Sequence, residues 1–356
     1  EADKAYETVQ TDNESLGVVF NYDSRQDKIF NESTIQIENL NKKNNELPTI
    51  GFIGAGTFSR AILIPAFKSQ KVNFKTLASF SGLNSTYYGK KFGFNNSTTD
   101  LKNIFDDKTI NTVVIASRHD SHADLALKGI KAKKNIFIEK PLCINIDQHK
   151  AIESEMKTNP SINLMIGFNR RFSPFISKIK DLLKNSQNPI SMIMTVNAGS
   201  IPKDHWIHNK KIGGGRIIGE ACHFIDLLRF LAESRISNYN KTTMNDKLND
   251  TLTINLFFEN GSIGTIHYFT NGHNKLQKEK LEIFSNGRYL SLDNFKRLSS
   301  YGFRGFNKTS FFSQNKGHKE CVKAFIESIK NNKSSPIPFD EILEVSRISI
   351  DLSKEE

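Results

Sequence analysis

The sequence predicts an α/β protein with an N-terminal Rossmann domain, built on a doubly wound parallel sheet, and a C-terminal α/β domain with an open, mainly antiparallel sheet. Short continuous apolar runs alternate with helical patterns across 48–167, which is typical of a parallel sheet covered on both faces. After residue 190 the strands alternate apolar and polar residues, which favours a sheet with one covered face. Asn260-Gly261 and Asn286-Gly287 are hairpin turn signals within this second part.

Three parts follow from these patterns. Residues 1–47 hold ten acidic and five basic residues. Ala5–Val9 is a candidate helix, Leu16–Tyr22 a candidate strand, and 23–47 has no steady period and is interpreted as linker. The expected divisions are 1–47 as the remnant of an upstream domain with its acidic linker, 48–170 as the dinucleotide-binding domain, and 171–356 as the substrate-binding and oligomerisation domain.

The elements follow in order along the chain. The parallel strands are expected at Thr49–Ile53, Phe74–Phe80, Thr112–Ala116, Asn135–Glu139 and Asn163–Gly167. Their helices are expected at Phe58–Phe67, His122–Ile130 and Ile146–Met156. The second sheet is expected to use Ile190–Val196, Leu252–Phe258, Gly261–Tyr268, Lys280–Phe284 and Arg288–Leu292, before two closing helices at His318–Lys330 and Asp340–Leu352.

Composition excludes several classes of protein. No apolar run reaches eighteen residues and the first residues are acidic and polar, so neither a membrane span nor a signal peptide is expected. Three widely spaced cysteines give no disulfide scaffold and no four-cysteine zinc site, which favours a cytoplasmic setting and no metal. The net charge is +11, and 271–320 holds ten basic against four acidic residues. Without a nucleic-acid motif, this region indicates either a solvated surface or an anionic small molecule.

The strongest local motif is Gly51-Phe-Ile-Gly-Ala-Gly-Thr-Phe-Ser59, which follows a strand and opens a helix. Gly54 permits a tight turn, and Gly56 lets the backbone approach a pyrophosphate at the helix N-terminus. Thr57 and Phe58 complete the turn. Ser59 replaces the usual third glycine or alanine but is still small. The motif predicts a dinucleotide site.

The residues that would hold the ribose are less informative. The second strand ends in Ala78-Ser-Phe-Ser-Gly82, with no acid at the usual place. Ser79 or Ser81 could hydrogen-bond the ribose. The missing carboxylate removes its repulsion of a 2′-phosphate, yet no arginine stands beside it to bind one. NAD and NADP both remain open.

Glu139-Lys-Pro141 lies at the carboxyl end of a parallel strand, the edge at which such sheets bind ligands. Pro141 favours an extended Lys140, whose side chain then projects from the strand end, and the bond between them is a candidate for a cis peptide. A lysine in a partly desolvated cleft can transfer protons near neutral pH. The alternative is a surface lysine before a loop proline.

The third motif is Gly213-Gly-Gly-Arg-Ile-Ile-Gly-Glu-Ala-Cys-His-Phe-Ile-Asp226. Helical spacing places Glu220, His223 and Asp226 on one face, so a carboxylate is expected to flank His223 and raise its basicity. That is what a general base for an alcohol requires. A solvated polar face is the alternative. The three glycines before the helix favour close approach of a ligand to the backbone.

Smaller features lie at the same expected edge. Arginines follow the last parallel strand and could meet a phosphate or a sugar hydroxyl, and the single tryptophan is either a sugar-stacking ring or a buried anchor. These additional candidates are Ser117, Arg118, His119 and His122 toward the cofactor, and Arg170, Arg171 and Trp206 toward the substrate.

Four motifs in this order resemble the glucose–fructose oxidoreductase, inositol dehydrogenase and MocA family over residues 48–356. They are Gly54-Ala-Gly56, Glu139-Lys-Pro141, Gly167-Phe-Asn-Arg-Arg171, and Gly213-Gly-Gly215 with His223-x-x-Asp226. The resemblance implies an NAD(P)-dependent oxidoreductase acting on a sugar, polyol or sugar nucleotide, and a homo-oligomer formed through the C-terminal sheet. It implies that Glu139 lies near the nicotinamide ribose, that Lys140 touches the substrate hydroxyl, and that His223 exchanges its proton.

One position departs from that family. An aspartate is common four residues before the histidine, and here the residue is Gly219; Glu220 or Asp226 is expected to take its role. The block from Arg216 to Asp226 resembles a subgroup fused behind a zinc-type alcohol dehydrogenase-like domain. Residues 5–22 are similar to the end of such a domain, which predicts that the chain is the C-terminal part of a bi-domain oxidoreductase.

Three functions remain in order of preference. The first is hydride transfer between nicotinamide and a carbinol carbon, with His223 or Lys140 taking the hydroxyl proton and Lys140 stabilising the alkoxide. The second is an NAD-dependent glycosidase of the same fold. The third is a non-catalytic protein that binds a dinucleotide or a sugar.

Overall fold

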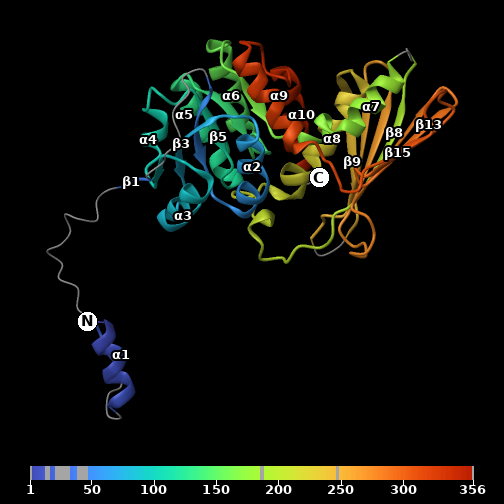
Figure 1. Ribbon diagram of the computed structural model, residues 1–356. Coiled ribbons are helices and arrows are strands. Elements are labelled where there is room, and N and C mark those ends of the chain that lie inside the picture. Colours follow the sequence, from blue (N-terminus) through green and yellow to red (C-terminus); the bar gives the residue numbers. More distant parts are fainter. Residues whose placement is uncertain are drawn as a thin grey trace.

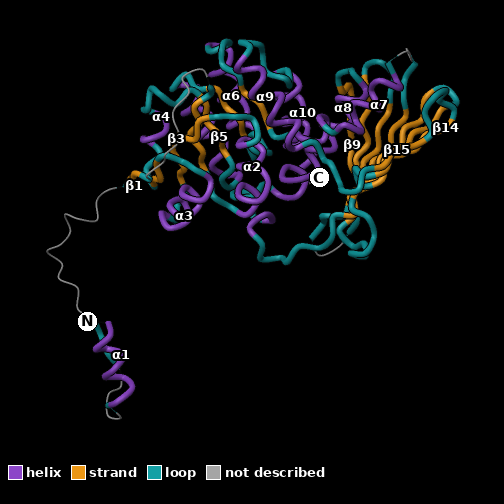
Figure 2. The backbone as a smooth tube through the Cα atoms, in the orientation of Figure 1, coloured by secondary structure: helices purple, strands orange, loops and turns teal. Residues whose placement is uncertain are grey.

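The computed structural model describes residues 2–12, 17–20, 33–37, 47–184, 188–245 and 248–354. Figure 1 shows two sheets side by side, each with its own helices, and helix α1 (Ala2–Thr11) drawn apart from both. The first sheet is enclosed by helices, whereas the strands of the second fan out to one side of the molecule (Figure 2). Both sheet classes predicted from the sequence are confirmed.

The first sheet has the order β1-β4-β3-β2-β5-β6-β7. Strands β3 and β4 lie on one side of β2, and β5 to β7 lie on the other. The order in which strands are added to the sheet therefore reverses beside β2, and a ligand crevice forms at such a switch point. All pairs are parallel except β1 with β4. The strands are β2 (Thr49–Ile53), β3 (Asn73–Ala78), β4 (Asn96–Thr98), β5 (Thr112–Ile115), β6 (Asn135–Ile138) and β7 (Leu164–Ile166).

Helices cover both faces of this sheet, and side chains of β2, β5 and β6 are buried almost completely, which explains their unbroken apolar sequences. A π-helical turn, Ser59–Leu63, precedes α2 and accommodates Pro65, which has no N–H to donate. The helices are α2 (Ile64–Lys68), α3 (Gly82–Phe92), α4 (Lys102–Phe105), α5 (His122–Lys131) and α6 (Ile146–Thr158).

The segment before Pro48 differs from expectation. Gly17–Phe20, the described part of the strand expected at Leu16–Tyr22, is not a strand. Within the expected linker, β1 (Thr34–Gln36) instead pairs antiparallel with β4 at the sheet edge. The linker interpretation was wrong there, because three residues carry too little pattern to indicate a strand that pairs with a distant edge. The rest of 21–46 lies mostly outside the described residues.

The second sheet has the order β15-β14-β13-β12-β8-β11-β10-β9. Its pairs are antiparallel except β8 with β11, which run parallel because the chain crosses over between them. Asn286 and Gly287 both have positive φ, as the predicted two-residue hairpin requires. The strands are β8 (Ser191–Asn197), β9 (Ile236–Thr243), β10 (Leu252–Phe258), β11 (Ile263–Phe269), β12 (Glu279–Ser285), β13 (Arg288–Asp293), β14 (Arg297–Tyr301) and β15 (Lys308–Ser310).

One face of this sheet packs on helices α7 (Pro174–Leu183) and α8 (Cys222–Ala232). The contact is close: a Cβ added to Gly264 on β11 would lie 2.9 Å from Leu228 Cδ1 on α8. The helix α8 is buried nearly all round. The alternative of a solvated polar face on this helix is therefore wrong. The opposite face of the sheet carries Thr, Asn and scattered aromatic side chains.

The two last helices return to the first sheet. In Figure 1, α9 (His318–Lys330) and α10 (Phe339–Ser353) lie beside α6 rather than over the second sheet. Phe325 packs edge-on against Phe137 of β6 at 5.4 Å, and His149 Nε2 lies 3.0 Å from the Leu343 carbonyl. Both halves of the molecule therefore share one continuous core.

Candidate active site

The turn after β2 has the geometry of a phosphate-binding loop. Gly54 has φ +109°, and a Cβ there would lie 2.3 Å from the Ala116 carbonyl oxygen, so only glycine fits between the loops after β2 and β5. A Cβ on Gly56 would meet no heavy atom within 4 Å, so its backbone faces open space at the start of the following helix. This cradle fits a pyrophosphate.

The predicted ribose side of this turn carries short polar groups. Ser79 Oγ donates to the Ser81 carbonyl at 2.5 Å. Phe80 beside it is fully exposed, and Thr57 and Phe58 are exposed on the neighbouring turn. The candidate cofactor residues of β2 and β3 thus gather at the carboxyl edge of the sheet.

The loop after β5 contains two histidines in different settings. His119 Nδ1 lies 2.8 Å from the Gly213 carbonyl oxygen, and its ring meets the Trp206 ring edge-on at 4.8 Å. The Arg118 guanidinium carbon lies over the same indole, 5.9 Å from the ring centroid. His119 therefore joins the first sheet to the glycine-rich segment of the second half.

His122 corrects the sequence interpretation. Its ring is fully buried, with Nδ1 2.7 Å from the Pro141 carbonyl oxygen and Nε2 3.1 Å from that of Ser117. The sequence placed it among the cofactor ligands, but both nitrogens contact backbone carbonyls and no surface is left for a ligand. His122 is the first residue of α5, and from there its ring joins the loop after β5 to the loop after β6.

Lys140 and Glu139 lie where β6 ends. The Lys140–Pro141 peptide is cis, and Lys140 Nζ donates to the Gly219 carbonyl at 2.5 Å. Glu139 lies against Gly167, where an added Cβ would be 2.7 Å from its Oε1. Burial raises the pKa of Glu139 to about 7, although Lys140 opposes the shift.

His223 lies one turn beyond Gly219 on the same helix, so Lys140 from one half and His223 from the other come together. The imidazole is buried, faces the Phe168 ring at 6.0 Å, and its Nδ1 has no hydrogen-bond partner in the described chain. Burial, and next Arg170 and Lys140, hold the pKa of His223 well below its usual value. The ring is therefore neutral at pH 7.

The two carboxylates expected to flank His223 turn elsewhere. Asp226 accepts from Arg171 at 2.5 and 3.0 Å. Glu220 accepts from Lys278 at 2.6 Å, from Arg216 at 3.2 Å and from the Tyr268 hydroxyl. For Glu220 the expected geometry was wrong because Ile217–Ala221 is a π-helical turn, which changes the angular spacing that an α-helix would give. Asp226 keeps α-helical spacing to His223, but its carboxylate is bound by Arg171 from the turn after β7.

The two candidate substrate arginines are also engaged in buried ion pairs. Arg170 donates two hydrogen bonds to Glu279, at 2.9 and 2.8 Å, and stacks on Phe224. Arg171 binds Asp226 and, at 2.8 Å, Glu341. Both guanidinium groups are nearly inaccessible, so neither is available to bind a substrate, and each instead ties the turn after β7 to the second half.

Sequence reasoning missed four residues of this cluster: Tyr268, Lys278, Lys316 and His318. Lys316 Nζ donates to Glu279 at 2.6 Å, and the His318 ring lies 5.7 Å from that of Phe58. The only signal for the lysines was the excess of basic residues across 271–320, which does not indicate which of them face the site.

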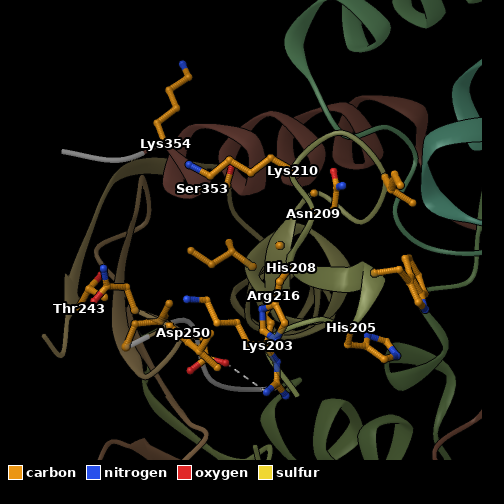
Figure 3. A pocket seen from close by; sticks show the side chains of 18 of the residues that line it. Lys203, His205, His208, Asn209, Lys210, Arg216, Thr243, Asp250, Ser353 and Lys354 are labelled. Carbon is orange, nitrogen blue, oxygen red and sulfur yellow. Dashed lines mark hydrogen bonds and ion pairs between the residues drawn. The ribbon is translucent and has the colours of Figure 1, made fainter. Parts of the chain in front are cut away.

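A separate pocket of about 980 Å³ is lined by residues between 203 and 217, between 241 and 252, and at 353 and 354 (Figure 3). Lysines and Arg216 dominate its charged lining, and Asp250 reaches Arg216 at 3.5 Å. Neither Lys140 nor His223 lines it. Trp206 does, and its ring also contacts His119 of the loop after β5.

Other kinds of site find no support in the described part of the chain. It contains no cluster of three or more His, Cys, Asp or Glu side chains able to hold a metal ion. All three cysteines are buried free thiols. Among the described helices, none is long and apolar enough to cross a membrane.

Comparison with known proteins identifies the class. A model described as an oxidoreductase family with an NAD-binding Rossmann fold matches residues 49–168, and the GFO/IDH/MocA C-terminal domain matches 189–288. The chain belongs to this GFO/IDH/MocA oxidoreductase family, and the family resemblance drawn from the sequence is confirmed. The nicotinamide dinucleotide that the family implies fits the open cradle at Gly54 and Gly56.

Individual relatives are distant. An uncharacterised oxidoreductase of Bacillus subtilis, YrbE, is 23% identical over 318 residues, which cover 84% of this chain and 91% of that protein. The myo-inositol 2-dehydrogenase of Thermotoga maritima is 24% identical over 264 residues, covering 68% and 77%. A levoglucosan dehydrogenase solved with NADH and levoglucosan superposes with TM-score 0.75 at 21% identity, covering 86% of this chain and 97% of that one.

Proposed function

We propose that the protein is an NAD(P)-dependent dehydrogenase that transfers a hydride between nicotinamide and a carbinol carbon of a sugar, polyol or sugar nucleotide. One observation carries the proposal: Lys140, from the ligand edge of the first sheet, reaches the backbone one turn before His223 of the second half. A cation and a neutral base thus meet beside the dinucleotide cradle. This pair is what the oxidation of an alcohol requires.

Each residue has a role in this proposal. Gly54, Gly56 and Thr57 hold the pyrophosphate, Ser79 and Ser81 the ribose, and Glu139 the nicotinamide side. When bound, the nicotinamide accepts or supplies the hydride. His223 takes the hydroxyl proton through its ring nitrogen, and the Lys140 ammonium stabilises the oxygen as negative charge develops. Glu220 and Asp226 act only through their partners, Lys278 and Arg171, as positioning residues.

The substrate class rests on the relatives. Two of the proteins named above are dehydrogenases of myo-inositol and of levoglucosan, a polyol and an anhydro sugar. Their shared chemistry is a ring carbinol, which suits a site with one proton acceptor and one cation. Trp206, edge-on to His119, is the candidate ring for stacking on a sugar face.

Assembly and location belong to the same proposal. The outer face of the second sheet presents Phe257 opposite Ile263 on neighbouring strands, both exposed, and we propose that this face joins copies of the chain. The three buried free thiols suit a reducing, cytoplasmic setting.

The first test is calorimetric titration of the purified chain with NADH and then NADPH. Tight binding of either supports the cradle, and the tighter one identifies the cofactor that Ser79 and Ser81 leave open. Turnover of polyols and sugars is then followed by NADH absorbance. Release of a sugar without net reduction of the cofactor would indicate a glycosidase, and binding without any turnover would indicate a binding protein.

A further inference from the structure

We propose that the carbohydrate substrate carries an anionic oxygen group, a carboxylate or a phosphate, that binds to Lys278 and Lys316. The inference rests on the proposed function and names the substrate class of the same site. Myo-inositol and levoglucosan, which give two of the relatives their names, are neutral molecules, so this charge would be a specificity of the present chain.

The two lysines occupy neighbouring places in the cluster. Lys278 directly precedes β12 and donates to Glu220 at 2.6 Å, whereas Lys316 donates to Glu279, the first residue of β12, at 2.6 Å. The Lys278 side chain is 42% exposed and that of Lys316 is 16% exposed. Both ammonium groups are thus partly dehydrated yet within reach of a ligand.

The backbone around Lys316 is held firmly. Asn169 Nδ2 donates to the Lys316 carbonyl at 2.7 Å, and Ser173 Oγ donates to the Asn315 carbonyl at 2.8 Å. Gly317 has φ +81°, and a Cβ there would lie 2.5 Å from the Asn169 carbonyl oxygen. The segment is therefore pressed against the turn after β7, and the position of Lys316 is fixed before any ligand arrives.

The basic side chains of this cluster outnumber their carboxylate partners by one. Glu279 already receives two hydrogen bonds from Arg170, so Lys316 is a second cation on the same carboxylate. Glu220 receives Lys278, Arg216 and the Tyr268 hydroxyl, and Arg216 also lies 3.5 Å from Asp250. Two arginines and two lysines thus face three carboxylates.

The charges around His223 lead to the same conclusion. Lys140, Arg170 and Lys316 all act on the imidazole, and each lowers its pKa. Arg170 and Lys278 likewise act on Lys316. Burial raises the pKa of Glu139 to about 7, so this carboxyl is only partly ionised at pH 7. The five cations Lys140, Arg170, Arg216, Lys278 and Lys316 then exceed the charge of Glu139, Glu220, Asp250 and Glu279. An anionic substrate group would offset the excess and would orient the ring carbinol toward Lys140 and His223.

The test compares matched probes by calorimetric titration, with and without NADH: D-glucuronate, D-glucose 6-phosphate and neutral D-glucose. The variants are Lys278→Gln, Lys316→Gln and the double variant, which leave both carboxylates paired with arginines. Lys308→Gln is the control, because this exposed lysine of β15 belongs to the same basic region but not to the cluster.

We expect one anionic probe to bind at least about tenfold more tightly than glucose, with roughly tenfold lost in each single variant and more in the double one. Glucose binding and the Lys308→Gln chain should not change. A preference for glucuronate identifies a carboxylate, and a preference for glucose 6-phosphate identifies a phosphate. Equal binding of charged and neutral probes, no binding of either anion, or an equal effect of Lys308→Gln would overturn the proposal. Anion binding without turnover would instead count against the dehydrogenase function alone.

Discussion

At the scale of single residues, Gly219 explains how the site differs from the family pattern. A Cβ there would lie 2.7 Å from Ile207 Cδ1 and 3.1 Å from His119 Cε1. The position usually held by aspartate is therefore filled by neighbours, and its carbonyl receives Lys140 instead. The lysine is therefore anchored by backbone rather than by a carboxylate.

Gly219→Ala tests this packing. Alanine gains up to about 1 kcal/mol of helix propensity but costs about 1–3 kcal/mol through overlap, so we expect a net loss near 1 kcal/mol in urea unfolding. Ile207→Val removes Cδ1 alone and provides the matched variant. The double variant should be more stable than the sum of the two single effects by about 1 kcal/mol; simple additivity would mean that the two positions do not touch.

Lys140→Ala tests the proposed chemistry. Removing the cation at the developing alkoxide should lower kcat by roughly 10²–10⁴-fold while the Kd for the dinucleotide changes little, because the cradle at Gly54 is untouched. Stopped-flow turnover and calorimetry measure the two quantities separately. A variant with normal kcat would remove Lys140 from the mechanism.

Glu139 gives a pH-dependent stability. The carboxyl ionises near 4.5 in the unfolded chain and near 7 in the folded protein. Between these values only the folded protein keeps the proton, so the free energy of unfolding falls as pH rises through this window, by about 3 kcal/mol. Glu139→Gln cannot titrate and should lack this loss. Urea unfolding at pH 5 and pH 8 measures it, and parallel curves for both chains would contradict the shifted pKa.

At the scale of elements, β1 is a strand of the first sheet that no sequence pattern predicted. Thr34 Oγ lies 2.9 Å from Thr98 Oγ across the pair, and Ile37 follows as a buried side chain. Gly89 of α3 makes room for it, since a Cβ there would lie 2.6 Å from Ile37 Cδ1. The strand covers an edge that would otherwise present unpaired backbone groups.

Ile37→Ala should therefore lower the free energy of unfolding by about 2–4 kcal/mol and speed amide exchange in β4. Ile35→Ala is the control, because that side chain is 49% exposed where Ile37 is 6% exposed. Its expected effect is below about 0.5 kcal/mol. Similar losses in both variants would show that the segment contributes through general apolarity rather than through the Gly89 contact.

At the scale of the whole molecule, the two sheets present opposite surfaces. The first is enclosed, whereas the second leaves one face without helices (Figure 1). If that face joins copies, Phe257→Asp with Ile263→Asp should shift the protein to a smaller species in light scattering. Leu83→Asp, an exposed residue of α3 in the other half, is the matched control. An unchanged mass in the double variant would rule out this interface.

The sequence predicted the features that depend on neighbouring residues but not those that depend on contacts between distant residues. The apolar strands and the Gly54–Gly56 turn follow from neighbouring residues and were found. The polar strand β9, the parallel pairing of β8 with β11, and the ion pair that joins Arg170 to Glu279 depend on residues far apart. The π-helical turn before His223 leaves no mark in the apolar spacing, which is why the direction of Glu220 was wrong. The direction of Asp226 depends on Arg171, a residue far away in the sequence.

The return of α9 and α10 to the first sheet has a consequence for how the chain matures. A polypeptide emerges from the ribosome with its N-terminal part first. The surfaces of α2 and α6 against which these helices pack must therefore stay uncovered until the substrate half has been synthesised. The nucleotide-binding half therefore cannot complete its folding before α9 and α10 have been synthesised. Its completion, and with it the ordered edge that Lys140 occupies, coincides with the arrival of the residues that bring Lys316 and His318 to the site.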